Sequence, residues 1–247
     1  MKEIPFWKIQ AVGNDYVYFD VNDMAINDII SKIPAICHRR FGIGGDGVVL
    51  IDFDTHRMTM YNADGSRGAI CGNALRAVGY LICKREDALC CTVKTDVGDR
   101  EVTVVDGLVE ATMGKGVILR KLKLRDGDCY IVDVGNLHAV SFDYRKDAQA
   151  LAEEVSDLLQ LDGINAEVGV AGKSAHVVVY ERGTGYTLSC GSGACAVGTV
   201  MWESGLADIG QEIAVDMPGG RLLVAYRDGL RLKGEVKIVA RGVYYAE

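Results

Sequence analysis

Short runs of alternating apolar and polar residues, rich in Val, Ile and aromatic residues, recur along most of the chain. Such alternation is typical of β-strands, whose successive side chains point to opposite faces of a sheet. Strands are predicted at residues 6–13, 16–21, 47–53, 57–62, 90–98, 100–105, 108–114, 130–135, 176–182, 212–217, 221–227 and 236–245.

Helices are predicted at residues 26–40, 72–86, 146–160 and 191–204, and those at 26–40 and 146–160 show apolar spacing of three and four residues. The strands come in consecutive runs joined by short turns that contain glycine or aspartate, rather than alternating one by one with helices. This order favours an α+β fold with largely antiparallel sheets over a doubly wound parallel fold.

The second half of the chain repeats the first. The matching pairs are AVGND at 11–15 with DVGNL at 133–137, Tyr61 with Tyr180, Cys71 with Cys190, and GDREVTVVDGL at 98–108 with GGRLLVAYRDGL at 219–230. Matching blocks in the same order at a nearly constant offset indicate two homologous lobes. We predict an N-terminal lobe over residues 1–116 and a C-terminal lobe over residues 117–247, with a last strand that can return to the first lobe.

Each lobe places a cysteine where a strand and a glycine-containing turn lead into a predicted helix. The two stretches are ICGNALRAVG at 70–79 and SCGSGACAVG at 189–198, and Ala74 against Gly193 is one of the positions at which they differ. The unpaired N–H groups and the positive dipole end of a helix N-terminus favour a thiolate and lower the pKa of a thiol. The same N–H groups can bind a carboxylate.

If the two lobes face each other, the repeat brings both cysteines to one cleft. A carboxylate held between the two helix ends would present its α-carbon to a sulfur on each side. A thiolate could then remove the α-proton and a thiol could protonate the opposite face, which inverts the centre. The sequence therefore predicts a racemase or epimerase in which Cys71 and Cys190 are catalytic.

The composition limits the classes of molecule that this protein is expected to bind. A net charge of −7 offers no basic surplus for nucleic acid or anionic membrane, and no apolar run is long enough to span a bilayer. We expect a cytoplasmic protein that acts on a small molecule, with a homodimer as a candidate assembly. The eight cysteines show neither a CxxC pair nor a suitably spaced histidine, so neither a disulfide framework nor a metal site is predicted. Core packing is the expected role of Cys37, Cys83, Cys90, Cys91, Cys129 and Cys195.

Several longer stretches resemble the diaminopimelate epimerase family of amino-acid racemases, which work without pyridoxal phosphate and use two cysteines. They are AVGNDY at 11–16, GIGGDG at 42–47, YNADGSRGAICGNALR at 61–76, VGNLHAV at 134–140, INAEVG at 164–169, YERGTGYTLSCGSGACA at 180–196 and MPGG at 217–220. The resemblance implies two pseudo-symmetric lobes, each a mostly antiparallel sheet wrapped around a central helix, with the active site in the cleft between them. It also implies an isomerase that needs no cofactor and converts LL- to meso-diaminopimelate for lysine and peptidoglycan precursors.

The resemblance carries over individual residues. Cys71 and Cys190 match the acid–base pair, while Gly72, Asn73, Gly191, Ser192 and Asn14 match positions around the carboxylate of the reacting carbon. Asn62, Asn136, Asn165, Glu181 and Arg182 match positions that hold the unreacting end of diaminopimelate. Arg182 could bind its carboxylate bidentately, and Glu181 and the asparagine carbonyls could accept from its ammonium.

Other interpretations stay open at this stage. The same thiols could racemise another amino acid such as histidine, a single thiol could serve a Cys-His hydrolase, and two helix ends could form a non-catalytic carboxylate clamp. His138 could act as a general base, but no acidic partner is visible in the sequence, so we interpret it as a structural or supporting residue. Asp46 is interpreted as a turn former beside glycine.

Overall fold

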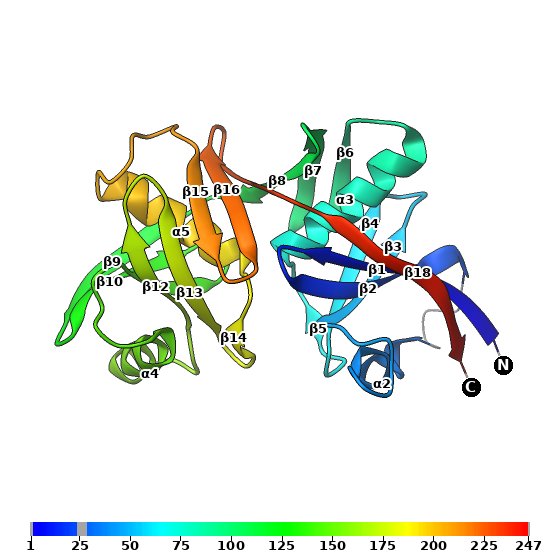
Figure 1. Ribbon diagram of the computed structural model, residues 1–247, viewed down its shortest axis with the longest axis horizontal. Coiled ribbons are helices and arrows are strands. Elements are labelled where there is room, and N and C mark those ends of the chain that lie inside the picture. The colour runs from blue at the N-terminus through cyan, green and yellow to red at the C-terminus, as the bar shows by residue number, and fades with distance from the viewer. Residues whose placement is uncertain (1, 24–28, 247) are drawn as a thin grey trace. The chain divides into compact units, whose positions relative to one another are not determined.

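The computed structural model describes residues 2–23 and 29–246. The chain divides into two compact units (Figure 1). Unit 1 comprises Met1–Ala111 together with Glu235–Glu247, and unit 2 comprises Thr112–Gly234. The predicted boundary after residue 116 lies a few residues inside unit 2, and the C-terminal strand belongs to unit 1.

Unit 1 is a mostly antiparallel sheet with one long helix. Its elements are β1 (Lys2–Ala11), β2 (Asn14–Asp20), the 3-10 turn η1 (Val21–Asp23), α2 (Ile33–Cys37), β3 (Gly47–Asp52), β4 (Arg57–Asn62), β5 (Arg67–Gly68), α3 (Gly72–Glu86), β6 (Cys90–Thr95), β7 (Gly98–Val105) and β18 (Lys237–Ala246), and β8 (Leu108–Gly114) crosses the boundary. Strands β2 and β3 pair in parallel, as do β4 and β6, and the other described pairs are antiparallel.

Unit 2 repeats this arrangement. Its elements are β9 (Val117–Leu124), β10 (Gly127–Asp133), β11 (Leu137–Ser141), α4 (Ala148–Leu159), β12 (Asn165–Ala171), β13 (Ala175–Glu181), β14 (Gly185–Thr187), α5 (Gly191–Glu203), β15 (Ile213–Met217), β16 (Gly220–Tyr226) and β17 (Leu230–Gly234). Strands β11 and β12 pair in parallel, as do β13 and β15, at the places that β2–β3 and β4–β6 take in unit 1. The sequence repeat is therefore also a repeat of sheet topology.

The long helix of each unit is buried against its own sheet. Helix α3 packs on β1, β2, β6 and β7, and α5 packs on strands from β9 to β17. The glycine of the shared Ala-Val-Gly motif permits this approach: a Cβ on Gly79 would lie 2.4 Å from Val102 of β7, and one on Gly198 would lie 3.0 Å from Val224 of β16. Each helix can thus lie close to the strand it packs on.

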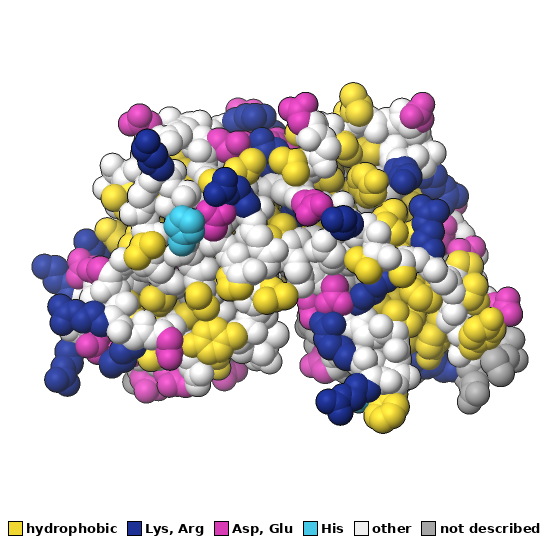
Figure 2. All heavy atoms as spheres, viewed as in Figure 1, with side chains coloured by type: hydrophobic (Ala, Val, Ile, Leu, Met, Phe, Trp, Pro, Cys, Tyr) yellow, Lys and Arg dark blue, Asp and Glu magenta, His cyan; other side chains and the backbone are white. Residues whose placement is uncertain are grey.

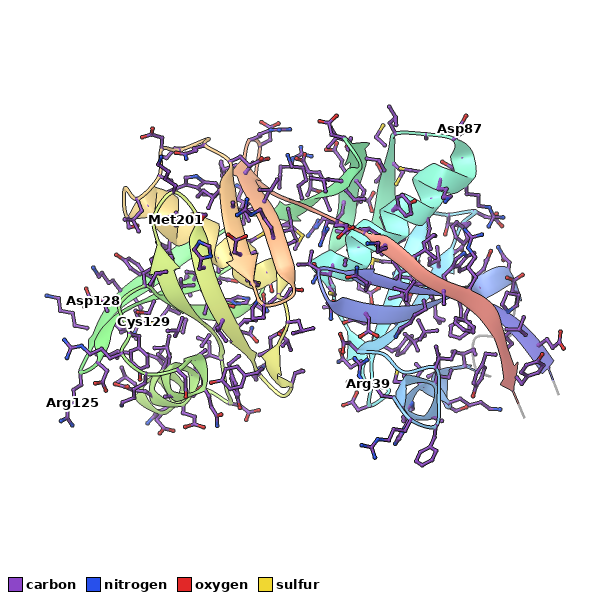
Figure 3. All side chains as sticks on the ribbon, in the orientation of Figure 1. Arg39, Asp87, Arg125, Asp128, Cys129 and Met201 are labelled. Atoms are coloured by element: carbon purple, nitrogen blue, oxygen red, sulfur yellow. The ribbon has the colours of Figure 1, made fainter. Side chains whose placement is uncertain are left out.

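The shorter helices cover separate apolar clusters. In unit 1, α2 packs Ile33 and Ile36 against Val17 and Phe19 of β2. In unit 2, α4 packs Leu151 and other apolar residues against strands that include Cys129, which Figure 3 labels. The tip of the β9–β10 hairpin carries Lys and Arg side chains with acidic ones among them (Figure 2).

Three of the four predicted helices match α3, α4 and α5 to within two residues at each end. The prediction at 26–40 is wrong in extent, although its residues 26–28 lie outside the described ones. Helix α2 ends at Cys37 because His38 adopts an extended backbone, and its Nδ1 accepts from the N–H groups of Arg40 and Phe41 at 3.1 Å each.

The α+β fold class is confirmed, with a mostly antiparallel sheet in each unit. Strands β5, β9, β11, β12, β14 and β17 are additional to the predicted set. Most of the remaining cysteines are buried as expected, but Cys90 is exposed and Cys91 half-buried, so core packing was wrong for Cys90. Among the described residues, no helix combines the length and apolar character needed to cross a membrane.

Candidate active site

In unit 1, Cys71 is the N-cap residue of α3. Its backbone is extended (φ −128°, ψ 122°), so the chain turns into the helix directly after the sulfur-bearing residue. The side chain is half-buried, and its Sγ donates to Asn14 Oδ1 at 3.4 Å. The predicted residues Cys71 and Asn14, which are far apart in sequence, therefore meet in one unit.

Asp46 fixes the orientation of the Asn14 amide. Asn14 Nδ2 donates to Asp46 Oδ2 at 2.7 Å, and the backbone N–H of Asp15 donates to the same oxygen at 3.0 Å. Arg39, labelled in Figure 3, binds the other oxygen of Asp46 at 2.8 Å. With its NH2 group held, Asn14 must turn its carbonyl oxygen toward Cys71. Asp46 is thus more than the turn former that the sequence indicated.

Tyr16 also lies next to Cys71. It is buried, and burial together with the neighbouring Cys71 raises the pKa of its hydroxyl well above the ordinary value. A phenol with a raised pKa stays protonated at neutral pH. Tyr16 therefore places a protonated hydroxyl group next to the Cys71 thiol.

The next predicted positions in unit 1 differ in burial. Asn73 is buried on the first turn of α3, and its Oδ1 accepts from Arg76 Nη2 at 2.6 Å. Arg76 is fully buried and also donates to the Glu235 carbonyl at 3.2 Å. Asn62 is exposed at the end of β4 and bonds Ser66 Oγ at 2.9 Å. Its amide is therefore bound into the β4–β5 hairpin.

In unit 2, Cys190 is the N-cap residue of α5, with nearly the same backbone angles as Cys71 (φ −130°, ψ 118°). Its Sγ accepts from the N–H of Gly193 at 3.3 Å, which satisfies one open donor of the first helical turn. The same sulfur lies 3.3 Å from Ser192 Oγ. Cys190 is buried, unlike Cys71.

Behind Ser192 lies a buried pair of titratable side chains that the sequence did not reveal. His138 Nε2 is 3.1 Å from Ser192 Oγ and 3.2 Å from Asn136 Oδ1, and its Nδ1 is 2.8 Å from Glu167 Oε1. His138 and Glu167 are fully buried. The acidic partner that the sequence analysis did not find for His138 is therefore Glu167.

The expected lowering of the thiol pKa is wrong for Cys190. Burial raises the pKa of this thiol well above its ordinary value, and the carboxylates of Glu181 and Glu167 raise it further. The hydrogen bonds from Ser192 and Gly193 oppose this shift but do not outweigh it. The surroundings of Cys190 thus hold it as a neutral thiol, a proton donor.

Glu181 belongs to the same cluster. Its carboxylate accepts from Thr187 Oγ1 at 2.5 Å, and it also interacts with the Cys190 thiol. Burial raises the pKa of Glu181, and Glu167 adds to the shift. The structure therefore places Glu181 beside Cys190 and not beside the guanidinium of Arg182.

Arg182 and Asn165 lie at the end of β13 and the start of β12. The Arg182 side chain is exposed, and its guanidinium forms no ion pair with any residue in the described ranges. Asn165 is committed to the backbone, since its Nδ2 donates to the Leu137 carbonyl and its Oδ1 accepts from the Arg182 N–H, both at 3.0 Å. Asn165 thereby holds β11, β12 and β13 together, and Arg182 keeps a free charged end.

His138, Glu167 and Cys190 offer donor atoms that lie within 4.8 Å of one another, a set that could hold a metal ion. His138 Nδ1 and Glu167 Oε1 already form a hydrogen bond at 2.8 Å. Ligands of one tetrahedral ion at about 2.0–2.1 Å from it stand farther apart than that. The spacing suits a shared proton better than a metal.

A sequence profile described as diaminopimelate epimerase matches residues 6–119 and 130–239 of the chain. A diaminopimelate epimerase of Methanococcus maripaludis is 33% identical, over 90% of this chain and 92% of that protein.

The chain belongs to the diaminopimelate epimerase family.

A Bacillus cereus family member is 30% identical over 99% of this chain and 98% of its own length. A solved hydroxyproline epimerase from Agrobacterium vitis, with bound trans-4-hydroxy-L-proline, shares the fold with a TM-score of 0.72 at 11% identity, over 98% of this chain and 92% of that one. Membership of the diaminopimelate epimerase family makes this protein an isomerase.

Proposed function

We propose that this isomerase interconverts LL- and meso-2,6-diaminopimelate without a cofactor, as a step toward lysine and peptidoglycan precursors. Cys71 and Cys190 form the acid–base pair. The observation that carries the proposal is the placement of a cysteine at the N-cap of the long buried helix in both units. A duplicated thiol matches a reaction in which a planar carbanion must be reached from both faces.

The first turns of the two long helices offer N–H groups that can bind the carboxylate at the reacting end of the substrate. The backbone N–H groups of Gly72 and Gly191 lie in the first turns of α3 and α5, where they have no partner within the helix. Such groups bind a carboxylate and stabilise the negative charge that spreads onto it when the α-proton leaves. Asn73 and Ser192, the next residues, and Asn14 are proposed to orient that carboxylate.

The two thiols need different protonation states. A two-base inversion requires one thiolate to take the α-proton and one thiol to supply the new one. The high pKa of Cys190 supports its role as the proton donor in the resting enzyme. After one turnover the two states are exchanged, which equips the enzyme for the reverse reaction.

Diaminopimelate differs from smaller amino acids in its second, unreacting amino-acid end. Arg182 has an exposed guanidinium with no ion pair among the described residues, as a bidentate carboxylate ligand requires. The stem of Arg182 lies over Gly163, where a Cβ would be only 2.7 Å from Arg182 Cγ. We propose that Arg182, together with Asn62, Asn136 and Asn165, binds the unreacting amino-acid end.

Separate incubations test the substrate. The enzyme is supplied with LL-diaminopimelate, meso-diaminopimelate, L-histidine or trans-4-hydroxy-L-proline, and the stereoisomers are separated by chiral chromatography. We expect the two diaminopimelate isomers to reach the same mixture from either side and the other amino acids to keep their configuration. Inversion of another amino acid with no conversion of diaminopimelate would contradict the proposed substrate.

A further inference from the structure

Unit 2 contains an unbroken chain of hydrogen-bonding groups that starts at the Cys190 sulfur. The links are Cys190 Sγ to Ser192 Oγ at 3.3 Å, Ser192 Oγ to His138 Nε2 at 3.1 Å and His138 Nδ1 to Glu167 Oε1 at 2.8 Å. Each of the first three groups can both give and take a proton. The chain therefore has the composition of a proton path.

From this geometry, and resting on the proposed two-thiol function, we propose that His138 and Glu167 are the proton store of Cys190 and that Ser192 carries the proton between them. When Cys190 has given its proton to the substrate, its thiolate takes the hydroxyl proton of Ser192. Ser192 in turn takes the Nε2 proton of the His138 imidazolium. The result is a thiol, an intact hydroxyl and a neutral imidazole, which regains its proton from water that enters the site after the product has left.

The reverse transfer uses the same links. When Cys190 has taken an α-proton, the thiol proton passes to Ser192 and the Ser192 proton passes to His138 Nε2. Both forms of His138 have partners: the neutral ring accepts from Ser192, and the imidazolium can donate to Asn136 Oδ1 at 3.2 Å. No other reactant is needed, because only protons move.

The carboxylates that face Cys190 explain why a proton donor that can carry a positive charge suits this site. Cys190, His138 and Glu167 are all buried, so a proton on His138 lies close to the sulfur. Among the described residues, the titratable groups that face Cys190 are Glu181 on β13, Glu167 on β12 and His138 on β11, and of these three His138 can carry a positive charge. A proton on this imidazole stabilises the buried Glu167 carboxylate, whose Oε2 has no hydrogen-bond partner in the described part of the chain.

Unit 1 carries a different side chain at the position that matches His138. The residue two positions after Asn14 is Tyr16, where the matching residue after Asn136 is His138. The Cys71 thiol donates to the amide oxygen of Asn14, and the phenol of Tyr16 is a second hydrogen-bonding neighbour of the same thiol. The repeat has therefore kept the cysteine in both units, whereas the His138–Glu167 pair belongs to unit 2.

The proposal makes a kinetic distinction. A two-base isomerase ends each turnover with its thiols in exchanged protonation states and must reset them before it repeats the same direction. Slowing this reset lowers kcat but leaves kcat/KM unchanged, because kcat/KM contains only the steps up to product release. Product then binds to the enzyme form awaiting reset, so product inhibition changes from competitive to noncompetitive.

The test uses Glu167→Gln, which keeps the size of the side chain and removes its charge, and His138→Gln, which cannot store a proton. We expect kcat to fall about tenfold or more in both, with kcat/KM within about twofold of the wild type and noncompetitive product inhibition. Glu154→Gln is the matched control: Glu154 bonds Tyr144 at 2.6 Å on α4, away from Cys190, and its kinetics should equal those of the wild type.

Equal losses in kcat and kcat/KM, or product inhibition that stays competitive in both variants, would overturn the proton store while the epimerase function stands. Circular dichroism reports whether each variant is folded, and an unfolded Glu167→Gln leaves the decision to His138→Gln. A wild-type enzyme that exchanges no α-proton of diaminopimelate would overturn the proposed function, and the proton store with it. The two failures are thus separated by the wild-type control.

Discussion

Gly193 leaves the space that the Glu167 carboxylate occupies. A Cβ at position 193 would lie 2.2 Å from Glu167 Oε1 and 3.0 Å from its Cδ, closer than non-bonded atoms approach. The matching position in unit 1 is Ala74, which is buried in α3. The glycine at position 193 thus leaves room for the carboxylate of the buried His138–Glu167 pair in unit 2.

Gly193→Ala should displace Glu167 and, through it, His138. We expect a loss of about 1–3 kcal/mol in the free energy of unfolding, as for other overpacked cores, and a fall in kcat of about tenfold or more. Urea unfolding and steady-state kinetics measure the two effects. Gly172→Ala is the control, since a Cβ there meets no atom within 4 Å. A fully active Gly193→Ala enzyme would show that the carboxylate position does not matter.

Glu181→Gln should make the protein more stable and less active. Burial raises the pKa of Glu181, so the folded protein binds this proton more tightly than the unfolded chain does. The group therefore stabilises the fold at acidic pH, and that contribution is lost as the pH rises through its folded pKa. At neutral pH the buried carboxylate opposes folding, and glutamine removes this opposition.

Thermal melting across pH checks the prediction for Glu181. The melting temperature of Glu181→Gln should exceed that of the wild type at neutral pH, and the difference should disappear below about pH 4.3, the ordinary pKa of a glutamate. Activity should be reduced at every pH because the carboxylate beside Cys190 is gone. A variant less stable than the wild type at neutral pH would contradict the assigned pKa direction.

Arg182→Lys tests the remote carboxylate site. Lysine keeps the charge but loses the bidentate geometry, so KM for diaminopimelate should rise about tenfold with kcat within about threefold of the wild type. Arg221→Lys is a suitable control, because Arg221 forms a bidentate pair with Asp216 at 2.7 and 2.9 Å on the surface of unit 2. An unchanged KM in Arg182→Lys would remove Arg182 from the substrate site.

The main helices could be predicted from the sequence. The spacing of apolar residues predicted α4, the helices α3 and α5 were predicted at their positions, and the internal repeat predicted that a cysteine would begin each of these two. The extent of helix α2 was predicted wrongly, because its end depends on a local hydrogen bond of the His38 ring. Apolar spacing does not report such a bond.

The hydrogen-bond partners of the site residues were harder to predict from the sequence. Asp46 reaches Asn14 and Glu167 reaches His138 because β2 pairs with β3, and β11 with β12, in parallel. A parallel pair joins segments about thirty residues apart, and hydrophobic alternation does not give its register. One signal was available: Glu167 stands in NAEVGVA, where a charged residue among apolar ones in a buried strand indicates a buried partner.

The central claim is that two thiols act on one α-carbon. Proton NMR in D2O measures it directly, as loss of the α-proton signal of LL-diaminopimelate together with appearance of the meso isomer. We expect the wild type and the exposed-thiol control Cys90→Ala to exchange and invert, and Cys71→Ala and Cys190→Ala each to lose inversion by about a thousandfold or more. Inversion at the wild-type rate by either single variant would contradict the account.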